Sequence, residues 1–349
     1  MGRRASLLFA AVAVVWGIPY LFIKLAVEEG LSPGFVAWSR VAIAAALLLP
    51  LAWRVGALRG MRAQLGPLVA FSVCEVAIPF PLIAAGEQRI SSSLAAILIA
   101  SLPLVIAVLA MRFDPAERVT GVRLLGLLVG LAGVVVLLGV DVAGRAGELA
   151  GAAMVLLATV GYAAGSMIVK RRLSDVSPLG PVAAAMGIST LVLAPVAIVG
   201  WPSTVPSGTA LLSVAVLGFV CSALAFVLYF SLIAAIGPSR ASVITYLNPA
   251  VAVLLGVILL DERLATSAIA GLLLILAGSW LATDGRLPPG LARRQRSATS
   301  RSSRSASSSS RPGEGTIVDF TLRISIALSI ASAMPSSLNS KRVCISDHG

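Results

Sequence analysis

The sequence predicts an all-α polytopic membrane protein with ten transmembrane helices, arranged as two inverted five-helix repeats. Two observations lead to this fold class. First, hydrophobic residues make up 58% of the 349 residues and charged residues only 12%, whereas a soluble domain carries about 25% charged residues. Second, apolar stretches recur ten times, and motifs of the first five return in the second five about 145 residues later.

Each apolar stretch is long enough to be a membrane helix, which needs roughly 20 residues. Their Leu, Ala and Val runs are continuous, which favours helices over the alternating pattern of a β-barrel. The predicted spans are 7–27, 35–53, 65–85, 91–111, 121–140, 149–169, 180–199, 210–233, 241–260 and 265–281.

The internal repeat sets the domain organisation. We expect a first repeat over 5–140 and a second over 147–283. The echoed motifs are Ser32-Pro33 with Ser177-Pro178, Pro50 with Pro195, Glu117-Arg118 with Glu262-Arg263, Gly126 with Gly271, and Pro103 with Pro249. Because five is odd, the second copy must enter the membrane from the opposite side, as in secondary transporters.

The third region, 285–349, differs in composition. It is rich in Ser and Arg and carries +7 of the net charge of +12. The run from Arg293 to Arg311 has too little apolar surface to fold, so we expect a disordered cytoplasmic tail. The alternative is a basic arm that is attracted to anionic lipid headgroups.

Basic residues in the short loops fix the predicted orientation. With the N-terminus inside, twelve Lys or Arg residues lie on the cytoplasmic side and four outside, and basic loops stay inside. Ten spans then return the C-terminus to the cytoplasm, so we expect a multi-pass inner (plasma) membrane protein with both termini cytoplasmic. Arg3 and Arg4 also fit the start of a signal peptide, but the five-plus-five pattern needs the first span.

A family resemblance rests on motifs in both halves. The first repeat opens with Trp16-Gly17, Lys24 and Ser32-Pro33, and continues with Pro79 and Gly86-Glu87-Gln88 through Pro103-Leu104. The ends of both repeats also match the family pattern, with Glu117-Arg118, Gly126 and Gly133 in the first and Glu262-Arg263, Gly271 and Gly278 in the second. It resembles the EamA-like transporters of the drug/metabolite transporter superfamily over about residues 5 to 283. The resemblance implies a ten-helix secondary carrier, and many such carriers export amino acids or related metabolites. The tail has no counterpart in the family pattern.

Glu75 is the candidate proton-coupling residue. It lies in the middle of the third span, where an ionised carboxylate costs roughly 2.5–3.5 kcal/mol or more. Burial favours the neutral acid, so this carboxyl group can take up and release a proton during transport. The alternatives are a structural partner for Arg40 or Lys24, and a packing residue that stays protonated.

Arg40 lies about six residues into the second span and is a candidate to bind an anionic substrate group or Glu75. Lys24 lies near the outer end of the first span, and its side chain can extend to the interface.

Prolines inside spans mark candidate helix breaks, because proline removes a helical hydrogen bond. These are Pro19, Pro79, Pro103 and Pro249. Freed carbonyl groups are tolerated only beside protein or a water-filled cavity, although each proline can also be a plain packing kink. Polar residues near the last two breaks complete the candidate substrate site: Ser101, Tyr246 and Asn248.

Aromatic and glycine residues have competing interpretations. Trp16, Tyr20 and Tyr162 can line a substrate cavity or anchor the span ends at the interface. The glycines are predicted to allow close helix packing, and they are Gly126, Gly130, Gly133, Gly161, Gly165, Gly271 and Gly278.

These observations predict a secondary active transporter that exports a small metabolite by alternating access, with possible substrates including amino acids. No GxxxxGK[ST] motif for ATP is present, so an ion or solute gradient would drive it. We expect no cofactor, no metal and no nucleic-acid partner; the partners are a small-molecule substrate and the lipid bilayer. The alternatives are import, a non-transporting scaffold and a membrane-embedded enzyme. The enzyme is disfavoured because the only histidine, His348, lies far from the acidic residues of the spans and their loops.

Overall fold

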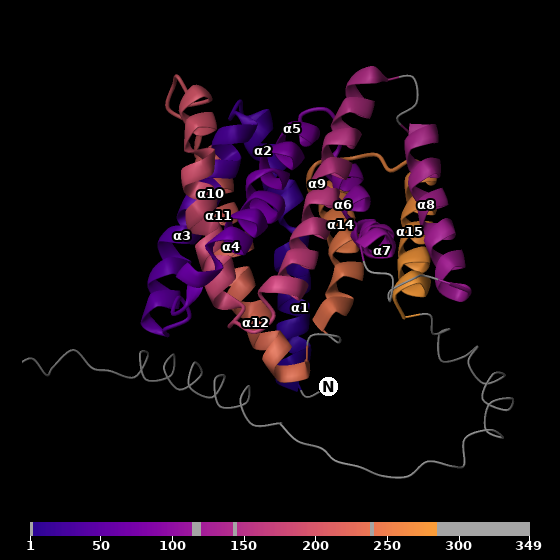
Figure 1. Cartoon of the computed structure of the whole chain (residues 1–349). Helices are drawn as coiled ribbons and strands as arrows, with labels where there is room; N and C mark the ends of the chain where they lie inside the picture. Colours follow the sequence, from indigo (N-terminus) through magenta and orange to yellow (C-terminus); the bar gives the residue numbers. More distant parts are fainter. Residues whose placement is uncertain (1–2, 114–119, 142–144, 238–240, 285–349) are drawn as a thin grey trace, which may run out of the picture. The chain divides into compact units, whose positions relative to one another are not determined.

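Helices account for all the regular structure in the described residues of this chain. The computed structural model describes residues 3–113, 120–141, 145–237 and 241–284 (Figure 1). The predicted tail, 285–349, and the repeat motif Glu117-Arg118 lie outside this part of the chain.

The helices follow the predicted spans closely. The first half contains α1 (Arg3–Gly17), α2 (Pro19–Glu28), α3 (Pro33–Arg54), η1 (Met61–Gln64), α4 (Leu65–Ser72), η2 (Val73–Ala77), α5 (Pro79–Glu87), α6 (Ser92–Ile99), α7 (Leu102–Phe113) and α8 (Val122–Asp141). The second half contains α9 (Ala146–Arg172), α10 (Leu179–Val199), α11 (Gly208–Gly218), η4 (Phe219–Leu224), α12 (Ala225–Ile236), η5 (Ser242–Tyr246), α14 (Asn248–Leu259) and α15 (Thr266–Asp284).

Seven helices, several of them built from consecutive segments, are long and apolar enough to cross a membrane. They cover 3–28, 33–54, 61–87, 92–112, 146–172, 179–199 and 208–236. Three shorter apolar helices, at 122–138, 243–259 and 266–282, fall on the other predicted spans. The prediction of an all-helical polytopic membrane protein is confirmed for the described residues, and ten membrane crossings remain a prediction.

Four prolines coincide with breaks between helical segments. Pro19 begins α2, Pro79 begins α5, Pro103 is the second residue of α7 and Pro249 the second residue of α14. By contrast, Pro50 and Pro195 lie inside the continuous helices α3 and α10. A proline position alone therefore does not decide where these helices break.

The two halves contact each other through corresponding helices. α3 packs along α10 and α8 along α15, while α6 packs on α14 (Figure 1). The segments α1 and α2 contact α12 and α11, and α4 and α5 contact α9 in the same manner. Exchanging the two halves maps the first three contacts onto themselves, and maps the contacts of α1 and α2 onto those of α9.

Glycines bring the backbones of α8 and α15 together. A methyl group added to Gly278 would meet the backbone of Gly130, and one added to Gly126 would meet Leu281 and Ala282. Gly133 faces Leu274 and the backbone of Gly271. Small residues allow this close approach, which lets dispersion contacts hold helices together in lipid.

We expect Gly278→Ala to destabilise the protein, because the new methyl group collides with backbone atoms rather than with a flexible side chain. Overpacking of this kind costs about 1–3 kcal/mol. Thermal unfolding in detergent measures the change. Gly66→Ala on α4 is the control, since no heavy atom lies within 4 Å of its added methyl group. Equal midpoints for the two variants would contradict the packing argument.

Candidate functional site

Two π-helices occupy similar places in the two halves. η2 covers Val73–Ala77 and contains Glu75, and η4 covers Phe219–Leu224 and contains Ser222. Single π-turns of this kind occur frequently at functional sites, because the extra residue redirects side chains. They are a first indication of where polar groups meet in the interior.

Arg40 is the buried cation at the centre of the candidate site. Its Nε donates a hydrogen bond of 2.8 Å to Ser222 Oγ, and its Cζ lies 4.2 Å from the centroid of the Phe80 ring. Ser222 Oγ in turn donates to the Leu217 carbonyl at 2.9 Å. The guanidinium group thus contacts both halves, and none of these contacts occupies its two terminal nitrogens.

Two tyrosines from different halves lie within electrostatic range of Arg40. Tyr20 comes from α2 and Tyr162 from α9. Both rings also pack against the apolar core. The structure therefore brings together three of the predicted site residues, Tyr20, Arg40 and Tyr162.

Glu75 lies against α9 and forms no ion pair with Arg40 or Lys24 among the described residues. Its carboxylate occupies the space that a side chain on Gly165 would fill. Glu75 Oε2 is buried, and no described group donates a hydrogen bond to it. The absence of side chains at Gly161 and Gly165 on α9 therefore leaves space for the π-helix η2 and the Glu75 carboxylate.

Glu87 is a fully buried acid, which the sequence shows only as part of a family motif. It is 0% exposed, and neither carboxylate oxygen receives a hydrogen bond from the described residues. Lys24 does not bind this carboxylate. Its Nζ donates instead to the main-chain carbonyls of Glu87 at 2.7 Å and Ile90 at 3.1 Å, and lies 3.5 Å from Glu28.

The remaining predicted site residues lie in other surroundings. Trp16 packs its ring on Tyr229 and Phe226, with centroids 4.5 and 5.9 Å away. Tyr246 lies 6.0 Å from the Trp280 ring. Ser101 is buried and donates to the Leu98 carbonyl at 2.6 Å beside the break before α7. Asn248 has a buried Oδ1 that accepts no hydrogen bond from the described residues.

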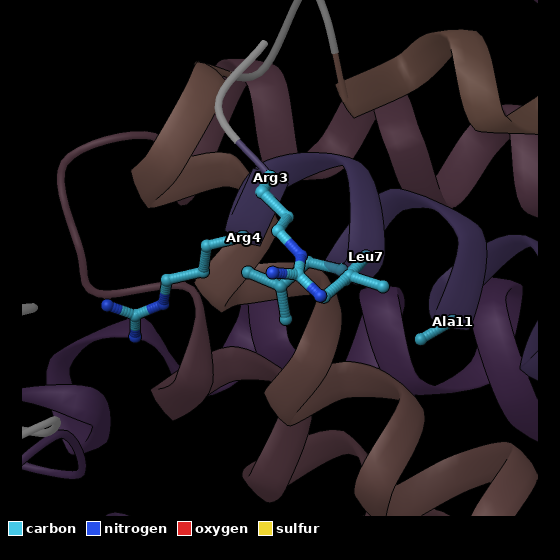
Figure 2. A pocket seen from close by; sticks show the side chains of 5 residues that line it. Arg3, Arg4, Leu7 and Ala11 are labelled. Carbon is cyan, nitrogen blue, oxygen red and sulfur yellow. The ribbon is translucent and has the colours of Figure 1, made fainter.

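An open hollow lies at the start of α1, apart from these buried groups. Arg3, Arg4, Leu7, Leu8 and Ala11 line it (Figure 2). Leu7 is largely exposed there. None of the predicted site residues contributes to this hollow, so we do not include it in the candidate site.

Comparison with known families identifies the fold and its class. The sequence pattern of the EamA-like transporter family matches residues 3–139 and again residues 149–283. The chain belongs to the EamA-like transporter family. Membership of this family implies that the protein lies in a lipid bilayer and acts on small molecules. It also indicates a transporter rather than an enzyme.

Relatives of this EamA-like protein are named as transporters. An "Uncharacterized transporter" from Archaeoglobus fulgidus is 28% identical over 283 residues, which covers 80% of this chain and 99% of the relative. The "Uncharacterized inner membrane transporter YedA" of Escherichia coli K12 is 28% identical over 259 residues, covering 73% and 82%. A protein of known crystal structure shares the fold, with a TM-score of 0.57 and 22% identity over 83% of this chain and 98% of that one.

One motif of the internal repeat joins the two halves of this EamA-like protein. Glu262, which follows α14, accepts hydrogen bonds from the main-chain nitrogens of Ser92 at 2.7 Å and Ser93 at 3.0 Å, and from the Ser93 hydroxyl. A carboxylate is favourable at this place because the first amides of a helix are unsatisfied and carry partial positive charge. Gly256 on α14 leaves the space for this contact.

Glu262→Ala should destabilise the protein by about 1–3 kcal/mol, because it leaves helix-terminal amides without their acceptor. Thermal or denaturant unfolding in detergent measures the loss. Glu148→Ala is the matched control, since Glu148 pairs with Arg145 at an exposed position and such pairs contribute little. If both variants unfold alike, the carboxylate does not hold α6 in the way described.

Proposed function

We propose that this protein is a secondary transporter that moves a small metabolite by alternating access between its two halves. The observation that carries the proposal is Arg40, a buried cation that bonds to Ser222 of the second half and stacks on Phe80 of the first half. A charged group at this depth is expensive, and in membrane proteins it usually faces a substrate or ion pathway.

The packing of the halves supports the inverted-repeat arrangement. The helix α3 contacts its counterpart α10, and α8 contacts its counterpart α15; the family pattern also occurs twice. A five-helix unit and its copy then cross the membrane in opposite directions, with both chain termini in the cytoplasm. Labelling of single cysteines placed in 54–64 tests this orientation, since this loop should react only from the cytoplasmic side.

The proposed substrate carries an anionic group, as an amino acid does, and is exported. Arginine presents paired donors that match a carboxylate, and the terminal nitrogens of Arg40 are available for this role. Tyr20 and Tyr162 would supply apolar walls with polar tips beside it. Trp16, Ser101, Tyr246 and Asn248 would contribute to the same pathway near the breaks between helices.

Counterflow into liposomes tests the function and the role of Arg40. Liposomes with purified protein are loaded with unlabelled amino acids and organic acids and mixed with trace labelled ones. We expect accumulation of at least one labelled solute, and a loss of about tenfold or more in Arg40→Ala, because charge-assisted hydrogen bonds contribute about 1.5–3 kcal/mol. Arg59→Ala, in the loop before η1, is the control. Absence of accumulation for every anionic solute, or full activity of Arg40→Ala, would contradict the proposal.

Glu75→Gln tests proton coupling at this acid. We expect the variant to exchange solute but to lose acceleration by an imposed pH gradient, because the amide cannot take up a proton. The ratio of uptake with and without the gradient is the measurement. Gly165→Ala is a companion variant that displaces the Glu75 side chain while the acid stays in the chain. Full uptake with an unchanged gradient response in Glu75→Gln would remove Glu75 from the coupling step.

A further inference from the structure

Hydrogen bonds seal one end of the helix bundle. This end is formed by residues 28–33, 87–93, 200–208 and 259–263, where α2 and α5 end near the top of Figure 1. Ser32 Oγ donates to the Gly200 carbonyl at 2.7 Å, and Ser207 Oγ donates to Glu29 at 2.6 Å. Together with the contact of Glu262 with α6, these bonds join the two halves at this end.

The repeat-related position at the other end lacks such a bond. Ser177 is the counterpart of Ser32 in the second half, 145 residues on. Its hydroxyl is buried and has no hydrogen-bond partner among the described residues. The two related serines thus differ in hydrogen bonding, so the bond that joins the halves at Ser32 is not repeated at the related position of the other end.

Glu87 is part of the closed end. It is the last residue of α5, and its own carbonyl holds the Lys24 ammonium group in the seal. Its side chain is fully buried, and no described donor reaches the carboxylate. An ionised carboxylate without hydrogen bonds is costly in such a place, whereas the protonated acid is neutral.

The charged groups that face Glu87 balance one another. Lys24 and Glu28 come from α2, Arg40 comes from α3, and Glu262 follows α14; the neutral Tyr20 also lies in range. Two cations and two acids thus surround the carboxyl group. The donors of Lys24 are bound to carbonyls and Glu28, and the Arg40 Nε to Ser222. Cations and acids are equal in number around Glu87, and its burial away from water favours the neutral carboxylic acid.

We propose that Glu87 is a second proton-binding residue besides Glu75, and that its protonation links closure of this end to proton uptake. The end closes over the neutral carboxylic acid and opens over the hydrated carboxylate. The proton comes from, and returns to, the water that reaches Glu87 when the end is open. The proposal rests on the proposed function in taking the opening of this end as a step of transport.

The direction of the pH effect follows from linkage. The closed state binds one more proton than the open state, so acid favours closure and alkali favours opening. For a single proton, the ratio of open to closed molecules changes by at most about tenfold per pH unit. The amides of Ser92 and Ser93 report this equilibrium directly, because Glu262 holds them in the closed end.

Hydrogen–deuterium exchange of the whole chain in lipid nanodiscs tests the proposal without a substrate. After correction for the intrinsic exchange rate, the peptide over 90–95 should exchange faster as the buffer changes from mildly acidic to mildly alkaline. Glu87→Gln should stay at the slow, acid level throughout, because the amide imitates the protonated acid. Glu87→Asp should keep the pH response, because it retains a carboxyl group; this variant shows whether a change at this position merely disturbs folding. Glu148→Gln, which removes an acid that pairs with Arg145, is the control for the loss of one acid.

Several results would overturn the proposal. One is an exchange rate over 90–95 that does not depend on pH in the native protein. Another is a Glu87→Gln variant whose exchange rate depends on pH as in the native protein. A response that disappears in Glu262→Gln or Glu75→Gln but survives in Glu87→Gln would assign the proton to one of those acids. Counterflow on the same variants distinguishes this proposal from the proposed transport function. If the native protein exchanges solute but its exchange over 90–95 does not depend on pH, the transport function stands and the role of Glu87 is rejected.

Discussion

Satisfaction of backbone polar groups without water is the constraint on which the rest of this structure depends. In lipid, a helix can break only where protein or an internal cavity receives the freed carbonyl and amide groups. The breaks at Pro19, Pro79, Pro103 and Pro249 obey this rule, since these four prolines belong to helices that pack on several others. Serine caps satisfy further amides at the starts of α3, α6 and α11.

The same constraint explains why the charged interior residues gather where the halves meet. Arg40 obtains its acceptor from a π-helix of the other half, and Glu262 finds donors at the start of a helix in the first half. Each of these groups depends on a partner that belongs to the other repeat. A relative movement of the halves must therefore exchange hydrogen bonds as well as apolar contacts, which gives such a protein discrete states rather than a continuous range.

The sequence predicted the apolar helices and the glycines that allow close packing, because both depend on composition and short-range pattern. Apolar length locates the helices, and the small residues at Gly130 and Gly278 mark the α8–α15 contact. The π-helices were not predicted, since one extra residue in a turn leaves no signature in an apolar run. Arg40 binds Ser222 rather than Glu75 because the π-turn of η4 presents that hydroxyl group to it.

Glu87 was missed for a different reason. It precedes Gln88 and Arg89 at the end of a span, where a charged residue is ordinarily an interface residue. Only the folded chain reveals that loops from both halves cover it, because these contacts join residues more than 60 positions apart. The acids Glu75 and Glu87 also differ in kind: Glu75 is half-buried with its Oε2 against the neighbouring helix α9, whereas Glu87 is fully buried at the end where hydrogen bonds join the halves. A carboxyl group of the second kind is sensitive to the conformation of the whole bundle, and this sensitivity is what a coupled transporter requires.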